Sequence, residues 1–218
     1  DEHIPSLYPG GRGQEMFFNW VDDTGKPKSH TWYPTVKKRI KVHVEKMAWQ
    51  MRSRKTHAEE LDVEFLSSPF SMDRVRFLCE ELGLQKIKIA SSEMMNFPML
   101  DYVNQHASTV FLSTGLSNLE EIGEAVSHLN GVADCYVLHC CTQYPALDWQ
   151  ANLQAITSMR QAFPEHKIGY SDHTLGSEAA VASVALGAQV IEKHFTLGKE
   201  LPGTDHIVSV NPVELKDM

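Results

Sequence analysis

Two histidines and a lysine are the residues of this sequence whose positions point most directly to chemistry. His173 and His194 lie at the ends of short β-branched or aromatic runs typical of strands, and Lys88 lies inside another such run. An unpaired lysine is costly to bury, so Lys88 needs an anionic partner, either a carboxylate such as Glu93 or a bound phosphate or carboxylate ligand. If the two imidazoles meet, they could bind a divalent metal, act as an acid–base pair or be satisfied core side chains.

Polar side chains also gather where each predicted strand ends. The set includes Ser67, Ser68, Ser91, Ser113, Thr114, His139, Thr142, Ser171, His173, His194 and Thr196. Helix N-capping explains some of the hydroxyl groups, but it explains neither the two histidines nor the lysine within a strand. The strands of a parallel barrel all point the same way, so these side chains are expected to converge on one mouth, where active sites of such barrels lie.

The elements that must position these residues alternate regularly from residue 61 onward. The predicted strands are Val63–Ser67, Lys86–Ser91, Thr109–Ser113, Cys135–Cys140, Lys167–Tyr170 and Gln189–His194, and amphipathic helical stretches separate them. This alternation requires a parallel sheet with helices outside it, either an open doubly wound sheet or a closed barrel. The sequence contains neither GxGxxG nor GxxxxGK[ST], which weakens the open nucleotide-binding sheet. We predict an α/β fold of the (β/α)8 TIM barrel class, incomplete because six βα units are recognised where eight are usual.

The first part of the chain, residues 1–60, differs from the barrel region, residues 61–218, and is predicted to be an atypical N-terminal segment. It is rich in proline, glycine and aromatic residues near its start. Ile40, Val42 and Val44 alternate as in a strand, and residues 45–61 have the pattern of a helix. The basic residues between positions 37 and 55 are interpreted as a solvated face rather than as a binding site.

Charge and hydropathy argue against several classes of function. The chain of 218 residues has a formal net charge of −8, which disfavours nucleic acid or an anionic membrane as the main partner. No apolar run reaches the roughly 18–20 residues that span a bilayer, and residues 1–13 lack the pattern of a signal peptide. The four cysteines include no CxxC pair, so they are expected to be reduced. We therefore expect a cytoplasmic protein.

Several short sequence blocks together resemble those of a known family. In order, they are FLSSPFS at 65–71, KIASSE at 88–93, LSTG at 112–115, LHC at 138–140, GYSDHTLG at 169–176, IEKHFT at 191–196 and PGTDH at 202–206. They closely resemble the sialic acid synthase family, which includes N-acetylneuraminate, legionaminate, pseudaminate and spore-coat polysaccharide synthases. The GYSDHTLG and IEKHFT blocks are specific as a pair.

The resemblance implies a barrel enzyme that condenses phosphoenolpyruvate with N-acetylmannosamine or a related hexosamine. The product would be a nine-carbon sialic-type sugar acid, and phosphate would be released. The resemblance also implies a divalent metal, with Mn²⁺ or Mg²⁺ expected, and a homodimer for the full-length family.

The resemblance further implies roles for individual residues. His173 and His194 match the metal ligands. The residues that match the phosphoenolpyruvate pocket are Ser68, Lys88, Ser91, Thr142, Tyr144 and Ser171. Glu93 matches a contact to a sugar hydroxyl, Asp205 matches an acidic residue beside the sugar and the metal, and these two carboxylates are the predicted catalytic residues.

Two features of the family pattern do not occur in residues 1–60: a Lys-Phe-Gln block whose lysine binds phosphate, and a glutamate upstream of it. An alternative function is therefore a truncated, catalytically inactive barrel remnant that acts only in metal or partner binding. A third alternative is a related aldol-type synthase that makes a shorter sugar acid.

Overall fold

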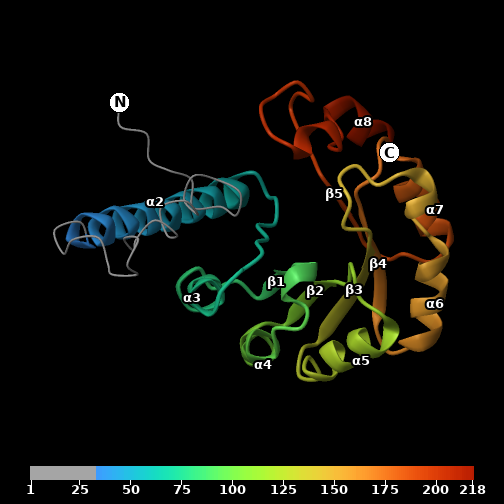
Figure 1. The fold of residues 1–218 in the computed structure, drawn as a ribbon, viewed down its shortest axis with the longest axis horizontal. Helices are drawn as coiled ribbons and strands as arrows, with labels where there is room; N and C mark the ends of the chain where they lie inside the picture. Colours follow the sequence, from blue (N-terminus) through green and yellow to red (C-terminus); the bar gives the residue numbers. More distant parts are fainter. Residues whose placement is uncertain (1–32) are drawn as a thin grey trace, which may run out of the picture. The chain divides into compact units, whose positions relative to one another are not determined.

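The computed structural model describes the backbone of residues 33–218 and the side chains of residues 47–218. The chain divides into two compact units, Asp1–Phe65 and Leu66–Met218. The first unit contributes one described helix, α2 (Tyr33–Glu60) (Figure 1). The first 32 residues of the predicted N-terminal segment lie outside the described residues.

Helix α2 corrects one prediction and bears out another. The strand predicted around Ile40, Val42 and Val44 is wrong because these residues lie within the helix. Three alternating β-branched residues are outweighed by the lysine, arginine, glutamate, alanine and methionine residues around them, all good helix formers. The helix predicted for residues 45–61 is confirmed as its second half. Pro34 is the second residue of α2, a position where its missing N–H costs nothing.

The second unit is built on a parallel sheet whose strands follow one another in chain order. Its strands are β1 (Lys86–Ile89), β2 (Thr109–Ser113), β3 (Asp134–Cys140), β4 (Lys167–Asp172) and β5 (Ile191–Lys193). Each strand pairs in parallel with the next, in the order β1-β2-β3-β4-β5. A doubly wound sheet would instead reverse its strand order at a switch point. The sheet is therefore a half-barrel, as expected of an incomplete TIM barrel.

The first of the six predicted strands, Val63–Ser67, is not formed. The chain at residues 63–69 is extended but lies outside the sheet, and its hydrogen bond to β1 is from Lys88 N to Ser67 O at 3.3 Å. Val63 and Leu66 are exposed, so the apolar side chains of this run have no packed face to hold it in a ladder. Five strands, not six, make up the described sheet.

Helices connect the strands and cover one face of the sheet. The helices are α3 (Met72–Arg76), which continues as η1 (Phe77–Glu81), α4 (Phe97–His106), α5 (Leu119–Ser127), α6 (Gln154–Ala162), α7 (Glu178–Ala185) and α8 (Pro212–Asp217). Three short 3₁₀ turns are η2 (Ser91–Glu93), η3 (Asp148–Gln150) and η4 (Asp205–Ile207). Helices α4 to α7 lie along the outside of the curved sheet (Figure 1). No helix in the described part of the chain has the length and apolarity that crossing a membrane requires.

The two faces of the sheet differ in chemistry because successive strand residues point to opposite sides. The side chains toward the helices form the core and include Ile87, Ile89, Val110, Leu112, Val137 and Ile168, all almost fully buried. The opposite face carries Lys88, Ser113, Cys140, Ser171 and Glu192 toward the carboxyl ends of the strands. The apolar face thus fixes the sheet, and the polar face presents the groups that could act on a ligand.

Candidate active site

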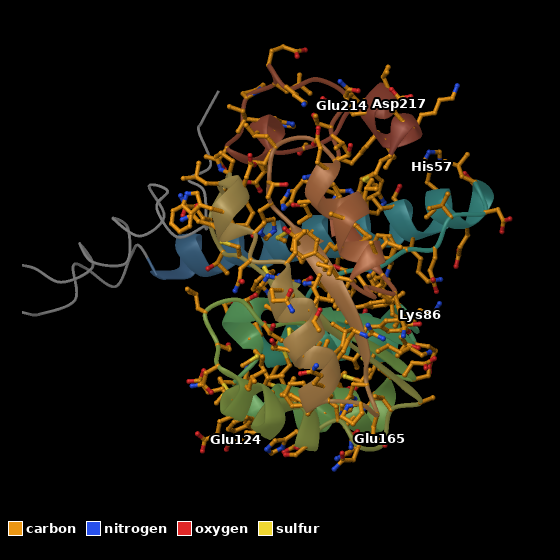
Figure 2. All side chains as sticks on the ribbon, turned by 90° about the vertical axis from the view of Figure 1, so that its right-hand side faces the viewer. His57, Lys86, Glu124, Glu165, Glu214 and Asp217 are labelled. Carbon is orange, nitrogen blue, oxygen red and sulfur yellow. The ribbon has the colours of Figure 1, made fainter. Side chains whose placement is uncertain are left out.

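The candidate site lies at the carboxyl ends of the strands. Figure 2 shows Glu124 and Glu165 at one end of the second unit, and Glu214 and Asp217 of α8 at the other. Glu165 lies in the turn before β4 and therefore marks the amino ends of the strands, whereas α8 lies beyond the carboxyl end of β5. The site is on the α8 side, as expected for a parallel barrel.

The two predicted metal-binding histidines lie side by side. His173 follows β4 and His194 follows β5, and their ring centroids are 5.3 Å apart with an interplanar angle of 62°. The ring of Tyr144 lies 4.0 Å from that of His173 and 5.6 Å from that of His194. Three residues that are distant in sequence therefore meet at one place.

The surroundings of His173 favour a neutral imidazole with one free nitrogen. Its Nδ1 lies 2.6 Å from the carbonyl oxygen of Cys141, so Nδ1 donates its hydrogen there and Nε2 is left without one. Burial lowers the pKa of His173, outweighing the hydrogen bond to Cys141 that raises it. A neutral imidazole whose other nitrogen is already hydrogen-bonded is the usual form of a metal-binding histidine.

A carboxylate completes this side of the site. Asp205 Oδ2 lies 3.9 Å from His194 Nδ1, and the Asp205 side chain is 56% exposed. Among the described residues, no group of three or more histidine, cysteine, aspartate or glutamate side chains is arranged to hold a metal ion. The donor set of two imidazoles with a carboxylate beside them nevertheless fits a divalent metal that takes its other ligands from water or substrate oxygens.

Lys88 forms the centre of a second cluster, and its partner is not the one predicted. The lysine is 7% exposed; its Nζ donates to Ser113 Oγ at 2.7 Å and lies 3.4 Å from Glu192 Oε2. Glu192 Oε1 also accepts a hydrogen bond of 2.7 Å from Ser171 Oγ. The carboxylate partner is therefore Glu192, whereas Glu93 accepts a hydrogen bond from Asn96 Nδ2 within its own turn.

Glu192 was not among the predicted site residues, and Ser113 was named only among the polar residues at the strand ends. Glu192 belongs to the IEKHFT block and precedes His194 by two residues, so both project to the same side of β5. The register of the sheet places it directly opposite Ser171. The two-residue spacing from His194 was visible in the sequence, but the neighbour across the sheet was not.

Gly115 brings two further predicted residues together. Its backbone N donates to Ser91 Oγ at 3.0 Å. A Cβ added at Gly115 would overlap Thr142 Cγ2 and lie 3.0 Å from Ser91 Oγ. A side chain at this position would therefore displace Thr142 and press on Ser91, in the loops after β3 and β1. Ser68 lies next to Ser67, whose carbonyl accepts from the backbone of Lys88 at the edge of the same site.

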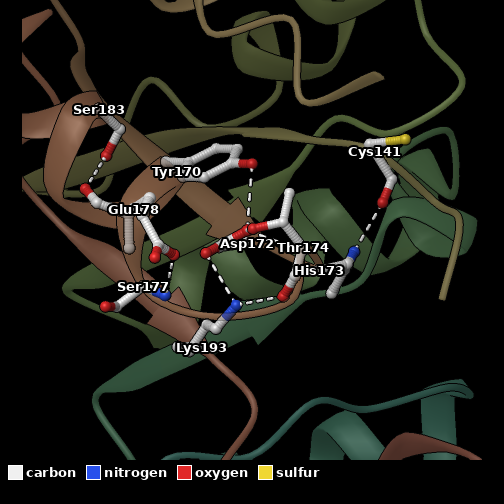
Figure 3. Close-up of polar contacts among 10 residues, drawn as sticks. Cys141, Tyr170, Asp172, His173, Thr174, Ser177, Glu178, Ser183 and Lys193 are labelled. Atoms are coloured by element: carbon white, nitrogen blue, oxygen red, sulfur yellow. Dashed lines mark hydrogen bonds and ion pairs between the residues drawn. The ribbon is translucent and has the colours of Figure 1, made fainter. Parts of the chain in front are cut away.

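A buried ion pair lies beside His173 (Figure 3). Lys193 Nζ is 2.9 Å from Asp172 Oδ2, and the two side chains are 3% and 0% exposed. Asp172 Oδ1 accepts from the backbone N and the Oγ1 of Thr174, at 2.9 and 2.8 Å, and from Tyr170 OH at 3.2 Å. Every charge of this pair thus has a partner, as a buried pair requires.

Acid should destabilise the second unit through His139, a histidine outside the candidate site. Its Nε2 bonds to Ala151 O at 2.7 Å and its ring stacks on Tyr170, and burial lowers its pKa, outweighing that hydrogen bond. The unfolded chain then binds more protons than the folded protein below the usual histidine pKa of 6.5. We expect the free energy of unfolding to fall as pH drops from 7.5 through this value, and to fall less in His139→Gln. Urea unfolding at several pH values measures both slopes, and equal slopes would contradict the prediction.

Known proteins share much of this sequence. The model of the NeuB family matches residues 22–218. The chain is 44% identical over 180 residues to N,N'-diacetyllegionaminic acid synthase of Campylobacter jejuni, covering 79% of this chain and 53% of that protein. It is 33% identical over 192 residues to N-acetylneuraminate-9-phosphate synthase of Homo sapiens, covering 87% of this chain and 52% of that protein. The chain spans about half the length of the curated relatives it matches.

Solved structures share the same fold. N-acetylneuraminic acid (sialic acid) synthetase of Leptospira borgpetersenii superposes with a TM-score of 0.74 at 33% identity, covering 78% of this chain and 59% of that chain. A DAHP synthase of Thermotoga maritima gives a TM-score of 0.65 at 14% identity, covering 78% and 52% respectively. The second likeness shows a shared fold alone.

Proposed function

Because the chain belongs to the NeuB family, whose members include synthases of sialic-type sugar acids, we propose that it condenses phosphoenolpyruvate with N-acetylmannosamine or a related hexosamine. The product is a nine-carbon sugar acid, and phosphate is released. The observation that supports this most directly is the meeting of His173 and His194 at one mouth of the half-barrel, 5.3 Å apart. The lysine and serine cluster around Lys88 lies at the same end of the sheet.

His173 and His194 are the residues that would hold the divalent metal, Mn²⁺ or Mg²⁺. When bound, the metal supplies Lewis-acid polarisation of the sugar aldehyde, the carbon that C3 of phosphoenolpyruvate attacks. Nε2 of His173 is available for this role because Nδ1 already bonds to Cys141 O.

The Lys88 cluster would bind the anionic groups of phosphoenolpyruvate. Lys88 is held in place by Ser113 and Glu192, so its ammonium is oriented before a ligand arrives. A phosphate or carboxylate would accept from Lys88 and Ser91, and from Ser171 once its hydroxyl turned from Glu192 to the ligand. Charge-assisted hydrogen bonds to such an anion are short and strong. Fixing the anion there would orient C3 toward the aldehyde, which lowers the entropic cost of the reaction.

The proposal also assigns a role to each remaining predicted site residue, namely Tyr144, Thr142, Asp205, Glu93 and Ser68. Partial burial, together with the nearby Cys140 and Asp205, raises the pKa of Tyr144 to about 12, so its hydroxyl keeps its hydrogen at neutral pH and would donate it to a bound anion. Asp205 beside His194 would orient or deprotonate the water that adds to C2, after which phosphate leaves by cleavage of its C–O bond. Glu93 would contact a sugar hydroxyl, and Ser68 and Thr142 would line the phosphoenolpyruvate pocket. A homodimer and a cytoplasmic location belong to the same proposal.

Phosphate release in the presence of phosphoenolpyruvate, Mn²⁺ and a panel of hexosamines tests this function. We expect release only when phosphoenolpyruvate, a hexosamine and the metal are all present, and a new sugar acid detected by mass spectrometry. The alternative is a barrel that binds the metal and phosphoenolpyruvate without catalysis. Binding of Mn²⁺ and phosphoenolpyruvate without phosphate release from any hexosamine would establish that alternative instead.

Replacing Lys88 by methionine should weaken phosphoenolpyruvate binding with little change in the apparent affinity for the hexosamine. Methionine keeps the length of the side chain but removes the charge that meets the anion. Loss of a buried charged hydrogen-bonding group costs about 2–3 kcal/mol, so we expect KM for phosphoenolpyruvate to rise roughly 30–100-fold. Steady-state kinetics with each substrate varied separately measures this. Lys199→Met is the matched control, because Lys199 pairs with Glu214 outside the cluster. An unchanged KM in Lys88→Met would exclude Lys88 from the anion site.

A further inference from the structure

The ion pair between Lys193 and Asp172 has an arrangement that stability alone does not explain. Each of the two residues immediately precedes one of the paired histidines in the sequence. They are also direct partners in the register between β4 and β5. We propose that Lys193 and Asp172 are positioning residues that fix the spacing and orientation of His173 and His194, an inference that rests on the proposed function.

Lys193 contacts the residues on both sides of His173. Its Nζ lies 2.9 Å from the carboxylate of Asp172, the residue before the histidine. The same Nζ donates to the carbonyl oxygen of Thr174, the residue after it, at 2.6 Å. The residue after this lysine, just beyond the end of β5, is His194. The ammonium group of Lys193 therefore connects the turn around His173 to the end of β5, which His194 follows.

Asp172 in turn fixes the shape of that turn. Its Oδ1 accepts from both the backbone N and the side-chain hydroxyl of Thr174, and Tyr170 donates to the same oxygen from within β4. Consecutive residues of a strand project to opposite faces, so the pair lies on the helix side of the sheet, behind the histidines. Figure 3 shows the polar contacts of this pair beside His173 and its bond to Cys141.

A buried ion pair is a poor way to gain stability, because apolar residues of similar volume often do as well or better. A fully hydrogen-bonded ion pair instead fixes the position and the orientation of both side chains. Groups that hydrogen-bond directly to metal-binding imidazoles orient them, and changing such groups typically weakens metal binding about 10–100-fold. The Lys193–Asp172 pair acts instead through the residues beside each histidine. The sheet also offers a comparison: Lys167 and Asp134 form an ion pair between β4 and β3, but their side chains are 40% and 41% exposed.

The test uses the double variant Asp172→Asn/Lys193→Met, which removes both charges together and leaves no unpaired buried ion. Long-range ¹H–¹⁵N spectra of the metal-free protein report which nitrogen of each imidazole carries hydrogen. We expect His173 to be a single Nδ1–H tautomer in the parent and a mixture in the double variant, with shifted resonances for His194. Asp134→Asn/Lys167→Met is the matched control and should leave both imidazoles as in the parent.

Mn²⁺ titration followed by electron paramagnetic resonance gives the second readout. We expect the Kd for Mn²⁺ to rise about 10–100-fold in the double variant and to stay at the parent value in the control. If the double variant does not fold, Thr174→Val removes one donor to Asp172 without changing volume, and it should shift the same imidazole resonances. Unaltered imidazole spectra in a folded variant would overturn the inference. A parent protein that binds no Mn²⁺ would refute the proposed metal site, whereas the metal-free spectra would still decide the positioning role.

Discussion

Replacing either His173 or His194 by alanine should abolish Mn²⁺ binding and slow metal-dependent phosphate release by at least about 100-fold. The reason is that the two imidazoles are the paired nitrogen ligands the described site offers, with ring centroids 5.3 Å apart. One imidazole with an exposed carboxylate beside it does not hold a divalent metal against water. Loss of the metal removes polarisation of the aldehyde, which is worth several kcal/mol in the transition state.

Calorimetric titration with Mn²⁺ and the phosphate-release assay measure the two effects separately. His106→Ala is a suitable control, because His106 is exposed on α4 and stacks on Tyr102 away from the site. Full activity in either alanine variant, or in the parent with excess chelator, would remove the metal role. If the parent protein releases no phosphate, loss of Mn²⁺ binding in the variants remains the decisive measurement.

The second large effect concerns stability. Asp172→Ala should lower the free energy of unfolding by about 3–5 kcal/mol, because it leaves the ammonium of a buried lysine without its counter-ion. Lys193 is only 3% exposed, so solvent cannot replace the lost carboxylate without opening the fold. Urea unfolding of the purified protein measures the change.

The double variant Asp172→Asn/Lys193→Met should recover most of that loss, because neither buried charge remains. Asp134→Ala, at the half-exposed pair with Lys167, should cost much less than Asp172→Ala. If Asp172→Ala lowers the free energy of unfolding only slightly, Lys193 must find another partner in that variant. The charges of the pair would then not fix its geometry. Together with the imidazole spectra, these measurements separate the contribution of the pair to folding from its contribution to the site.

Much of the sheet was predictable from the sequence, because alternation of short apolar runs with amphipathic stretches depends on local pattern alone. β2 begins and ends at the predicted residues, Thr109 and Ser113. The gathering of polar residues at one mouth followed from the single direction of parallel strands. The strand predicted at 63–67 failed because forming a strand requires hydrogen bonds to a neighbour, which the residue pattern does not reveal.

The partners within the site were less predictable. Glu93 is close to Lys88 in the sequence, but the carboxylate that reaches the ammonium comes from Glu192, more than 100 residues away. That contact depends on the register between β4 and β5, which sets Ser171 opposite Glu192. Periodicity shows which face a residue occupies, whereas the neighbour across a sheet is set by how complete strands align.

The missing side chain at Gly115 limits how this pocket can change. The backbone N–H of Gly115 reaches Ser91, and even a methyl group there would press on Thr142 and Ser91 together. Substitution at Gly115 would therefore displace Thr142 and Ser91, two of the residues proposed to bind phosphoenolpyruvate. Evolution of this pocket toward a larger or smaller anionic ligand would therefore have to proceed through the side chains of the surrounding loops. Gly115 itself would have to stay a glycine.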